Sequence, residues 1–96
     1  MVAPTTHPVQ LIQPDGQRVH NPAYSALVAD IGPARLRDLY RDLVVVRRLD
    51  NEAIALQRQG ELGLWAPMTG QEAAQVGSAR ALETDDYVFT SYREHA

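Results

Sequence analysis

Apolar side chains recur every three or four residues between positions 33 and 59, and this is the strongest pattern in the chain. Such spacing places one apolar stripe along an α-helix. Pro33 suits the first helical turn, and Gly60 suits the position just after the end. The pattern therefore predicts a helix over 33–59, about 40 Å long at 1.5 Å per residue. The stripe consists of Leu36, Leu39, Leu43, Val46, Leu49, Ala53 and Leu56.

Charged residues of both signs lie between the stripe positions. They are Arg35, Arg37, Asp38, Arg41, Asp42, Arg47, Arg48, Asp50, Glu52 and Arg58. Because Arg and Asp are usually exposed, these residues are predicted to form the solvated face of the helix. Arg48 and Glu52 are four positions apart, a spacing that favours an ion pair. A helix of this length cannot bury its whole stripe against the little chain that remains.

Residues 1–32 hold four of the six prolines and are predicted to form an extended N-terminal arm. Within the arm, segments 9–13 and 17–19 flank Pro14-Asp15-Gly16, a sequence typical of a tight turn. A hairpin is therefore predicted there. The alternative is a partly disordered tail, since chain termini often fray.

After Gly60 the chain enters an apolar loop, 64–68, that contains Trp65 and Ala66. Thr69 and Glu72 then match a capping box, which predicts a helix from Gly70 to Leu82. This helix carries many small residues, which would let another backbone approach closely. They are Ala73, Ala74, Gly77, Ser78 and Ala81.

A polar turn at 83–86 precedes residues 87–90, a β-rich run predicted to form one short strand. Helix, turn and strand make one α/β step, whose ligands lie beyond the carboxyl end of the strand, where Tyr92 and Arg93 stand. A guanidinium beside a phenol suits an anionic ligand, and the alternative is a structural role for the pair. His95 is a candidate for acid–base chemistry, but its only nearby carboxylate in sequence is that of Glu94.

Composition narrows the class of protein. The 96 residues suffice for one small domain or part of one, and the apolar fraction of 45% is ordinary for a globular chain. Cysteine is absent, which excludes disulfides and thiolate catalysis. The net charge of -3 and the lack of a basic block argue against nucleic acid as a partner. Without a signal sequence or an apolar span, a soluble, cytoplasmic protein is predicted.

Four stretches carry a resemblance to a known family. They are LYRDLVVVRRLD at 39–50, LQRQGELG at 56–63, GQEAAQVG at 70–77 and DDYVFTSYREH at 85–95. In this order they resemble the alpha subunit of the decarboxylating component of 2-oxo acid dehydrogenase complexes, of branched-chain or pyruvate type. The resemblance covers about 36–96 and is much weaker before that.

The resemblance implies an α/β fold, in which 33–96 begin a thiamine-diphosphate-binding domain that is incomplete here. It implies an alpha2beta2 heterotetramer that holds thiamine diphosphate and Mg²⁺ between alpha and beta subunits. Such enzymes decarboxylate a 2-oxo acid and pass the acyl group to a lipoyl-bearing acyltransferase core. Tyr92 and Arg93 match the family's Tyr-Arg pair at the cofactor diphosphate, whereas no catalytic residue and no metal ligand is assigned within this chain.

Two departures from the family pattern matter. The magnesium motif that begins Gly-Asp-Gly does not occur, so the chain is expected to be an N-terminal fragment that is inactive alone. Ala66 stands where pyruvate-type members have a histidine, which favours a branched or larger 2-oxo acid. The alternatives are a truncated or non-enzymatic subunit-interaction module and, among enzymes, the related acetoin-cleaving thiamine enzyme.

Overall fold

The structure is a computed structural model that describes residues 7–96. It divides into two compact units, Met1–Gly32 and Pro33–Ala96. Along the chain the described elements are the 3-10 helix η1 (Ser25–Val28), the long helix α1 (Pro33–Arg58) and the short helix α2 (Glu72–Ala79). The first six residues of the predicted N-terminal arm lie outside the described residues.

The first unit contains the predicted hairpin in its smallest form. Ile12 and Arg18 form one antiparallel bridge, and the Val19 amide donates to the Leu11 carbonyl at 2.9 Å. Gly16 closes the turn with a φ of +86°, in the left-handed region that glycine enters without strain. The hairpin is therefore confirmed, although the pairing is limited to a single bridge.

Helix η1 was not predicted from the sequence. The turn that leads into η1 is held by Asn21, whose side-chain Oδ1 accepts a hydrogen bond from the Ala23 amide at 3.0 Å. The Asn21 amide in turn donates to the Ser25 hydroxyl at 2.8 Å. Such local side-chain bonds nucleate turns without any apolar periodicity, so a search for helical patterns does not detect them.

Helix α1 confirms the long helix predicted over 33–59. It begins at Pro33, whose missing N–H costs nothing in the first turn. At the other end Gly60 has a φ of +78°, and its amide donates to the Gln57 carbonyl at 3.1 Å. The Glu61 amide reaches the Leu56 carbonyl at 3.0 Å. These two bonds form a Schellman motif, so Gly60 ends the helix as predicted.

The apolar stripe of α1 is covered only in part. Val46 and Ala53 are buried, whereas Leu49 and Leu56 remain exposed. Val46 forms a small core with Met68 and Val76, against which Leu39, Leu43 and Trp65 pack. A single short helix and one loop therefore cover the middle of α1 and leave part of the stripe exposed.

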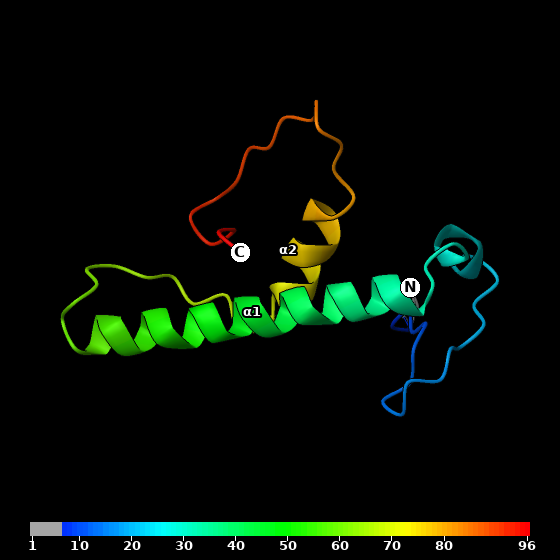
Figure 1. Ribbon diagram of the computed structural model, residues 1–96, viewed down its shortest axis with the longest axis horizontal. Helices are drawn as coiled ribbons and strands as arrows, with labels where there is room; N and C mark the ends of the chain where they lie inside the picture. Colours follow the sequence, from blue (N-terminus) through cyan, green and yellow to red (C-terminus); the bar gives the residue numbers. More distant parts are fainter. Residues whose placement is uncertain (1–6) are drawn as a thin grey trace, which may run out of the picture. The chain divides into compact units, whose positions relative to one another are not determined.

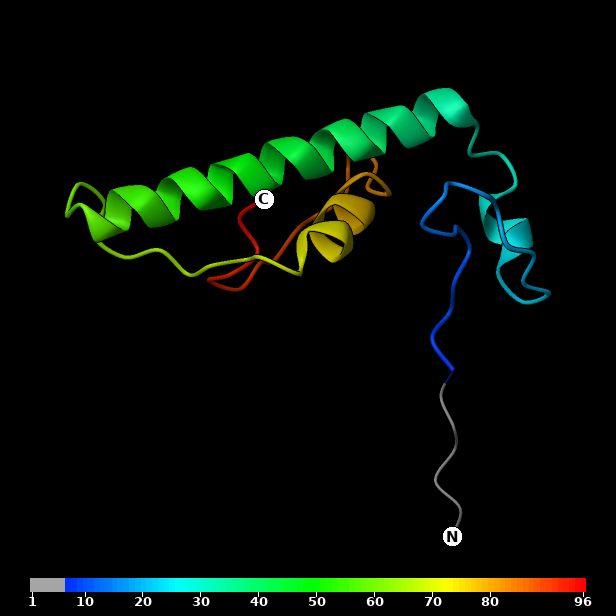
Figure 2. The ribbon, with the colours of Figure 1, turned by 90° about the horizontal axis from the view of Figure 1, so that it is seen from below.

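In the second unit the chain folds back on α1 twice (Figures 1 and 2). The segment that follows Gly60 runs back beside α1 and brings Met68 into the core. Helix α2 then lies against the middle of α1, and the residues after α2 return so that Ala96 lies beside both helices. The loop 64–68 and the C-terminal segment thus meet on the same side of α1.

Helix α2 is shorter than predicted, since the sequence indicated a helix from Gly70 to Leu82. It ends at Ala79, after which the amides of Ala81 and Leu82 bond to carbonyls three residues back. Gly77 and Ser78 weaken the helix just before this point: both have low helix propensity, and the Ser78 hydroxyl bonds to the Ala74 carbonyl at 2.8 Å.

The predicted capping box is wrong. The first turn of α2 receives no side-chain cap from Gln71, and the Thr69 hydroxyl donates to Asp50 instead. Glu72 does reach back, but to the Gly70 amide at 2.7 Å. The bond to the Asp50 carboxylate is charge-assisted and turns the Thr69 side chain towards α1.

Close backbone packing at Gly77 is also not found. A Cβ atom placed on this residue would meet no atom of the described chain within 4 Å. The small residues of α2 are exposed, and no neighbour within residues 7–96 explains the choice of glycine at position 77.

The strand predicted at 87–90 does not form. None of these residues takes part in a β-bridge, and Tyr87 and Phe89 are 90% and 94% exposed. A strand needs a partner to satisfy its backbone groups, and no other segment of residues 7–96 lies in place to pair with it. The described fold is thus mostly helical, and the α/β class stays a prediction.

No helix among the described residues is both long and apolar enough to cross a membrane.

Candidate functional site

A buried carboxylate stands at the centre of the second unit. Asp50 lies on α1 and is 0% exposed. Its Oδ1 accepts hydrogen bonds from the Trp65 indole N–H at 2.8 Å and from the Met68 amide at 3.1 Å, and its Oδ2 accepts from the Thr69 hydroxyl at 2.6 Å. One side chain therefore fixes both ends of the segment 65–69.

These hydrogen bonds keep Asp50 ionised. Burial by itself raises the pKa of the carboxyl group, because it penalises the charged form. The bonds from Thr69, Trp65 and Met68 outweigh burial, so the pKa of Asp50 lies below its usual value. The segment 65–69 is thus tied to α1 by charge-assisted bonds, which are stronger than bonds between neutral groups.

A second buried carboxylate joins α2 to α1. Glu72 forms an ion pair with Arg47, and its other oxygen accepts from the Gly70 amide. The hydrogen bond from Arg47, followed by the backbone amides of Glu72 and Gly70, lowers the pKa of Glu72 to about 2. At the far end of α2 the Arg80 guanidinium bonds to Asp42 of α1 at 2.6 Å. Helix α2 is therefore held to α1 at both ends.

Arg93, which was predicted to bind a cofactor, is anchored by the loop that Asp50 holds. Its Nη1 donates to the Pro67 carbonyl at 2.5 Å. Its own carbonyl accepts from Gln75 Nε2 at 3.1 Å, and Gln75 Oε1 accepts from the Ala96 amide at 3.1 Å. The backbone around Arg93 is thus fastened to α2, and its side chain is fastened to the loop.

Tyr92 lies beside Arg93 and is 79% exposed. The Arg93 guanidinium lies 5.4 Å from the centre of the Tyr92 ring, within range of a cation–π contact. The two residues therefore present a cation and a phenol together near the end of the C-terminal segment. Their binding role remains a prediction.

His95 packs against Trp65, with ring centres 4.1 Å apart and an angle of 64° between the rings. Its Nδ1 lies 3.3 Å from the Tyr92 carbonyl, and its buried Nε2 has no hydrogen-bond partner among the described residues. The neighbouring Glu94 carboxylate accepts from the Ser91 amide instead. His95 thus joins the cluster around Trp65, and no described carboxylate pairs with its ring.

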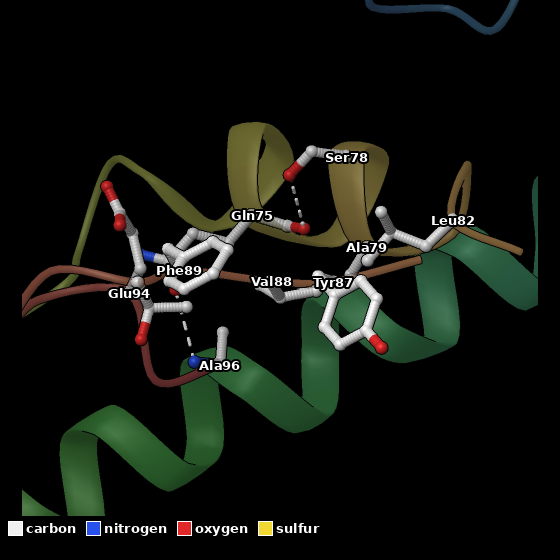
Figure 3. Close-up of a pocket in the computed structure, with 10 residues that line it drawn as sticks. Gln75, Ser78, Ala79, Leu82, Tyr87, Val88, Phe89, Glu94 and Ala96 are labelled. Atoms are coloured by element: carbon white, nitrogen blue, oxygen red, sulfur yellow. Dashed lines mark hydrogen bonds between the residues drawn. The ribbon is translucent and has the colours of Figure 1, made fainter. Parts of the chain in front are cut away.

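An open groove of about 460 Å³ lies between α2 and the C-terminal segment (Figure 3). Apolar side chains line most of it, among them Leu82, Tyr87 and Phe89, and Glu94 supplies its carboxylate. Neither Tyr92 nor Arg93 lines this groove, and it contains no cationic side chain. The groove therefore does not fit a diphosphate, and the anion-binding pair lies outside it.

The donors of Tyr92 and Arg93 do fit an anionic group. One guanidinium N–H is engaged by Pro67, which leaves the other donors of the fork available, and the phenol beside it is exposed. Residues 7–96 contain no group of three or more His, Asp or Glu side chains arranged to hold a metal ion.

The sequence prediction missed the network that positions this pair. Asp50 was assigned to the solvated face of the long helix, and that assignment is wrong. A signal was present: Asp50 stands four residues after Val46 and three before Ala53, which is the spacing of the apolar stripe. A carboxylate on such a stripe is buried only when donors surround it, and Trp65 and Thr69 are those donors.

Comparison with known proteins identifies the family. Residues 40–96, more than half of the chain, match the family model described as dehydrogenase E1 component. The chain belongs to this family.

Two curated relatives illustrate the range of the family. The chain is 49% identical over 87 residues to the 3-methyl-2-oxobutanoate dehydrogenase subunit alpha of Mycobacterium tuberculosis. The aligned residues make up 91% of this chain and 23% of that relative. The chain is 41% identical over 86 residues to the pyruvate dehydrogenase E1 component subunit alpha of Staphylococcus aureus, covering 90% of this chain and 22% of the relative. The chain thus spans about a quarter of the length of these relatives. No solved structure matched it.

Proposed function

We propose that this chain is the N-terminal part of an alpha subunit that oxidatively decarboxylates a 2-oxo acid with thiamine diphosphate and transfers the acyl group to a lipoyl-bearing acyltransferase. The chain's membership of the dehydrogenase E1 component family supports the class. The partners would be a beta subunit, in an alpha2beta2 heterotetramer, and the acyltransferase core. Mg²⁺ would be bound by residues outside this chain.

The observation that carries the proposal is the placement of Tyr92 and Arg93. Their phenol and guanidinium lie together, and bonds to Gln75 and Pro67 hold the Arg93 backbone and side chain in place. A fixed guanidinium fork suits the oxygens of a diphosphate, because its donors match two acceptor atoms at once. Arg93 would bind and orient the diphosphate end of the cofactor, and Tyr92 would add a neutral donor.

The chemistry of decarboxylation would come from the bound thiamine ring. This chain would contribute binding and orientation: Arg93 neutralises negative charge, and the loop 65–69 forms one wall beside it. Because the guanidinium is already held by the Pro67 carbonyl, little side-chain freedom is lost when an anion binds. Preorganisation of this kind favours tight binding of the cofactor.

The substrate we favour is a branched 2-oxo acid. The relative with 49% identity is named for 3-methyl-2-oxobutanoate, whereas those with 41% identity are named for pyruvate. Ala66 lies half-buried between Trp65 and Pro67, so this loop contributes apolar surface and no hydrogen-bonding side chain at that position. An apolar wall favours a larger alkyl group by about 1–3 kcal/mol per methylene.

The test is Arg93→Ala in the complete subunit assembled with its beta partner. We expect the dissociation constant of thiamine diphosphate, measured by calorimetry with Mg²⁺ present, to rise at least about tenfold, since a charge-assisted bond contributes about 1.5–3 kcal/mol. The melting temperature in the absence of the cofactor should change little.

Arg58→Ala is the matched control. Arg58 is exposed at the end of α1 and forms no ion pair with any described residue. It should leave the cofactor affinity unchanged, because it removes the same charge from a residue that bonds neither to the pair nor to the loop 65–69. An Arg93→Ala subunit that bound thiamine diphosphate as tightly as the Arg58→Ala subunit would remove Arg93 from the site.

A further inference from the structure

Asp50 is connected to the proposed cofactor site by a short chain of contacts. Its carboxylate holds Trp65, Met68 and Thr69, and thereby fixes the loop in which Pro67 lies. The Pro67 carbonyl accepts from Arg93 Nη1 at 2.5 Å. Two hydrogen-bonded steps therefore separate the Asp50 carboxylate from the guanidinium of Arg93.

A second set of contacts connects Asp50 to the site, through the rings of Trp65 and His95. The Trp65 indole, held by Asp50 through its N–H, packs edge-on against His95 with 4.1 Å between ring centres. His95 Nδ1 lies 3.3 Å from the Tyr92 carbonyl. Both residues of the predicted pair are thus supported by the loop that Asp50 fixes.

The core alone does not explain this arrangement. A buried, ionised carboxylate is costly to desolvate, and an apolar residue of similar size on the same stripe would pack against Met68 without that cost. An apolar residue could not orient the donors of Trp65, Met68 and Thr69. It therefore could not orient the Pro67 carbonyl, which lies in the same loop. The three bonds to Asp50 therefore set geometry more than they add stability.

We propose that Asp50 is a positioning residue of the cofactor site: it holds the loop 65–69 so that the Pro67 carbonyl and the Trp65 ring orient Arg93 and Tyr92. Asp50 itself contacts neither the cofactor nor the substrate. The inference rests on the proposed function, because it gives Asp50 a role only if Arg93 binds the diphosphate. Its test therefore includes Arg93.

The experiment is a double-mutant cycle in the complete subunit with its beta partner, with the dissociation constant of thiamine diphosphate as the readout. Asp50→Asn retains an oxygen for Trp65 and Met68 but replaces the charged acceptor that faces Thr69. We expect it to weaken binding about tenfold in the otherwise unchanged protein and less than about twofold in the Arg93→Ala background. Asp50 acts through Arg93, so its effect disappears when Arg93 is absent.

Asp42→Asn is the control on the same helix. It removes the ion pair with Arg80 at the far end of α2 and leaves the loop untouched. It should leave the affinity for the cofactor unchanged in both backgrounds. Thr69→Val, which removes only the 2.6 Å bond to Asp50, gives the same cycle if Asp50→Asn does not fold.

The possible outcomes separate the two proposals. If Arg93→Ala alone leaves thiamine diphosphate affinity unchanged, the proposed function fails, and the inference fails with it. If Arg93→Ala weakens binding while Asp50→Asn and Thr69→Val do not, the inference alone is overturned. It is also overturned if the Asp50 and Arg93 effects simply add, because independent effects would mean that Asp50 only stabilises the fold.

Discussion

At the scale of single residues, two buried carboxylates organise the second unit. Asp50 holds the loop 65–69, and Glu72 holds the start of α2 through Arg47. Both carboxyl groups have lowered pKa values, because hydrogen bonds outweigh the penalty of burial. The ion pair between Arg48 and Glu52, by contrast, was predicted from spacing and is confirmed at 2.6 Å, but it is exposed and contributes little.

The lowered pKa of Glu72 predicts acid sensitivity. The carboxyl group titrates at about 2 when folded and near 4.5 when unfolded, so the unfolded state binds the proton more readily. The stability that Glu72 contributes is therefore complete above pH 4.5 and is lost as the pH falls toward 2. We expect the urea midpoint of the chain to drop between pH 5 and pH 3.

Glu72→Gln is the comparison for this effect, because glutamine keeps the size of the side chain and does not titrate. The variant should be less stable than the original chain at pH 7 and should lose less stability on acidification. Some acid sensitivity remains, since the pKa values of Asp50 and Asp42 are also lowered. Equal losses in the two proteins between pH 5 and pH 3 would show that Glu72 is not held by Arg47 in solution.

At the scale of elements, the sequence predicted helix α1 and the hairpin turn, whose bounds are set by residues close to one another in the chain. The stripe, Pro33 and Gly60 together fixed α1 within one residue of its observed end. Pro14-Asp15-Gly16 fixed the hairpin turn. The predicted start of α2 and the strand at 87–90 were wrong because they depend on partners distant in sequence: the Thr69 side chain bonds to Asp50, and no described segment pairs with 87–90. The predicted end of α2 was wrong because Gly77 and Ser78 weaken the helix locally.

The Schellman motif at the end of α1 gives a test at this scale. Gly60 has a φ of +78°, so Gly60→Ala places a Cβ in the left-handed region and should destabilise the chain by about 1–2 kcal/mol. Gly63→Ala is the control, because Gly63 has no positive φ and a Cβ there meets no atom within 4 Å. Its effect should stay within about 0.5 kcal/mol in urea unfolding. If the two variants were equally stable, Gly60 would not adopt the left-handed conformation.

At the scale of the whole molecule, the supports of the candidate site come from three segments that the fold brings together: α1, the loop 65–69 and α2. Tyr92 and Arg93 could be predicted from their chemistry and from the resemblance to the family. Their supports could not, since Asp50, Pro67 and Gln75 reach them only through the fold. Sequence patterns report periodicity and local turns, whereas contacts across 18 to 26 positions require the packed arrangement of α1, the loop and α2.

Substrate choice is also a property of the whole assembled protein, and Ala66 tests it. Ala66→His adds a polar ring to the wall beside Trp65, so we expect the ratio of pyruvate to 3-methyl-2-oxobutanoate turnover in the complete enzyme to rise by about tenfold. Steady-state kcat/KM for both acids measures this ratio. Leu64→His is the control: Leu64 lies directly before the loop 65–69 and is exposed, so the same substitution there should leave the ratio unchanged. A ratio that moved equally in both variants, or in neither, would remove Ala66 from substrate selection.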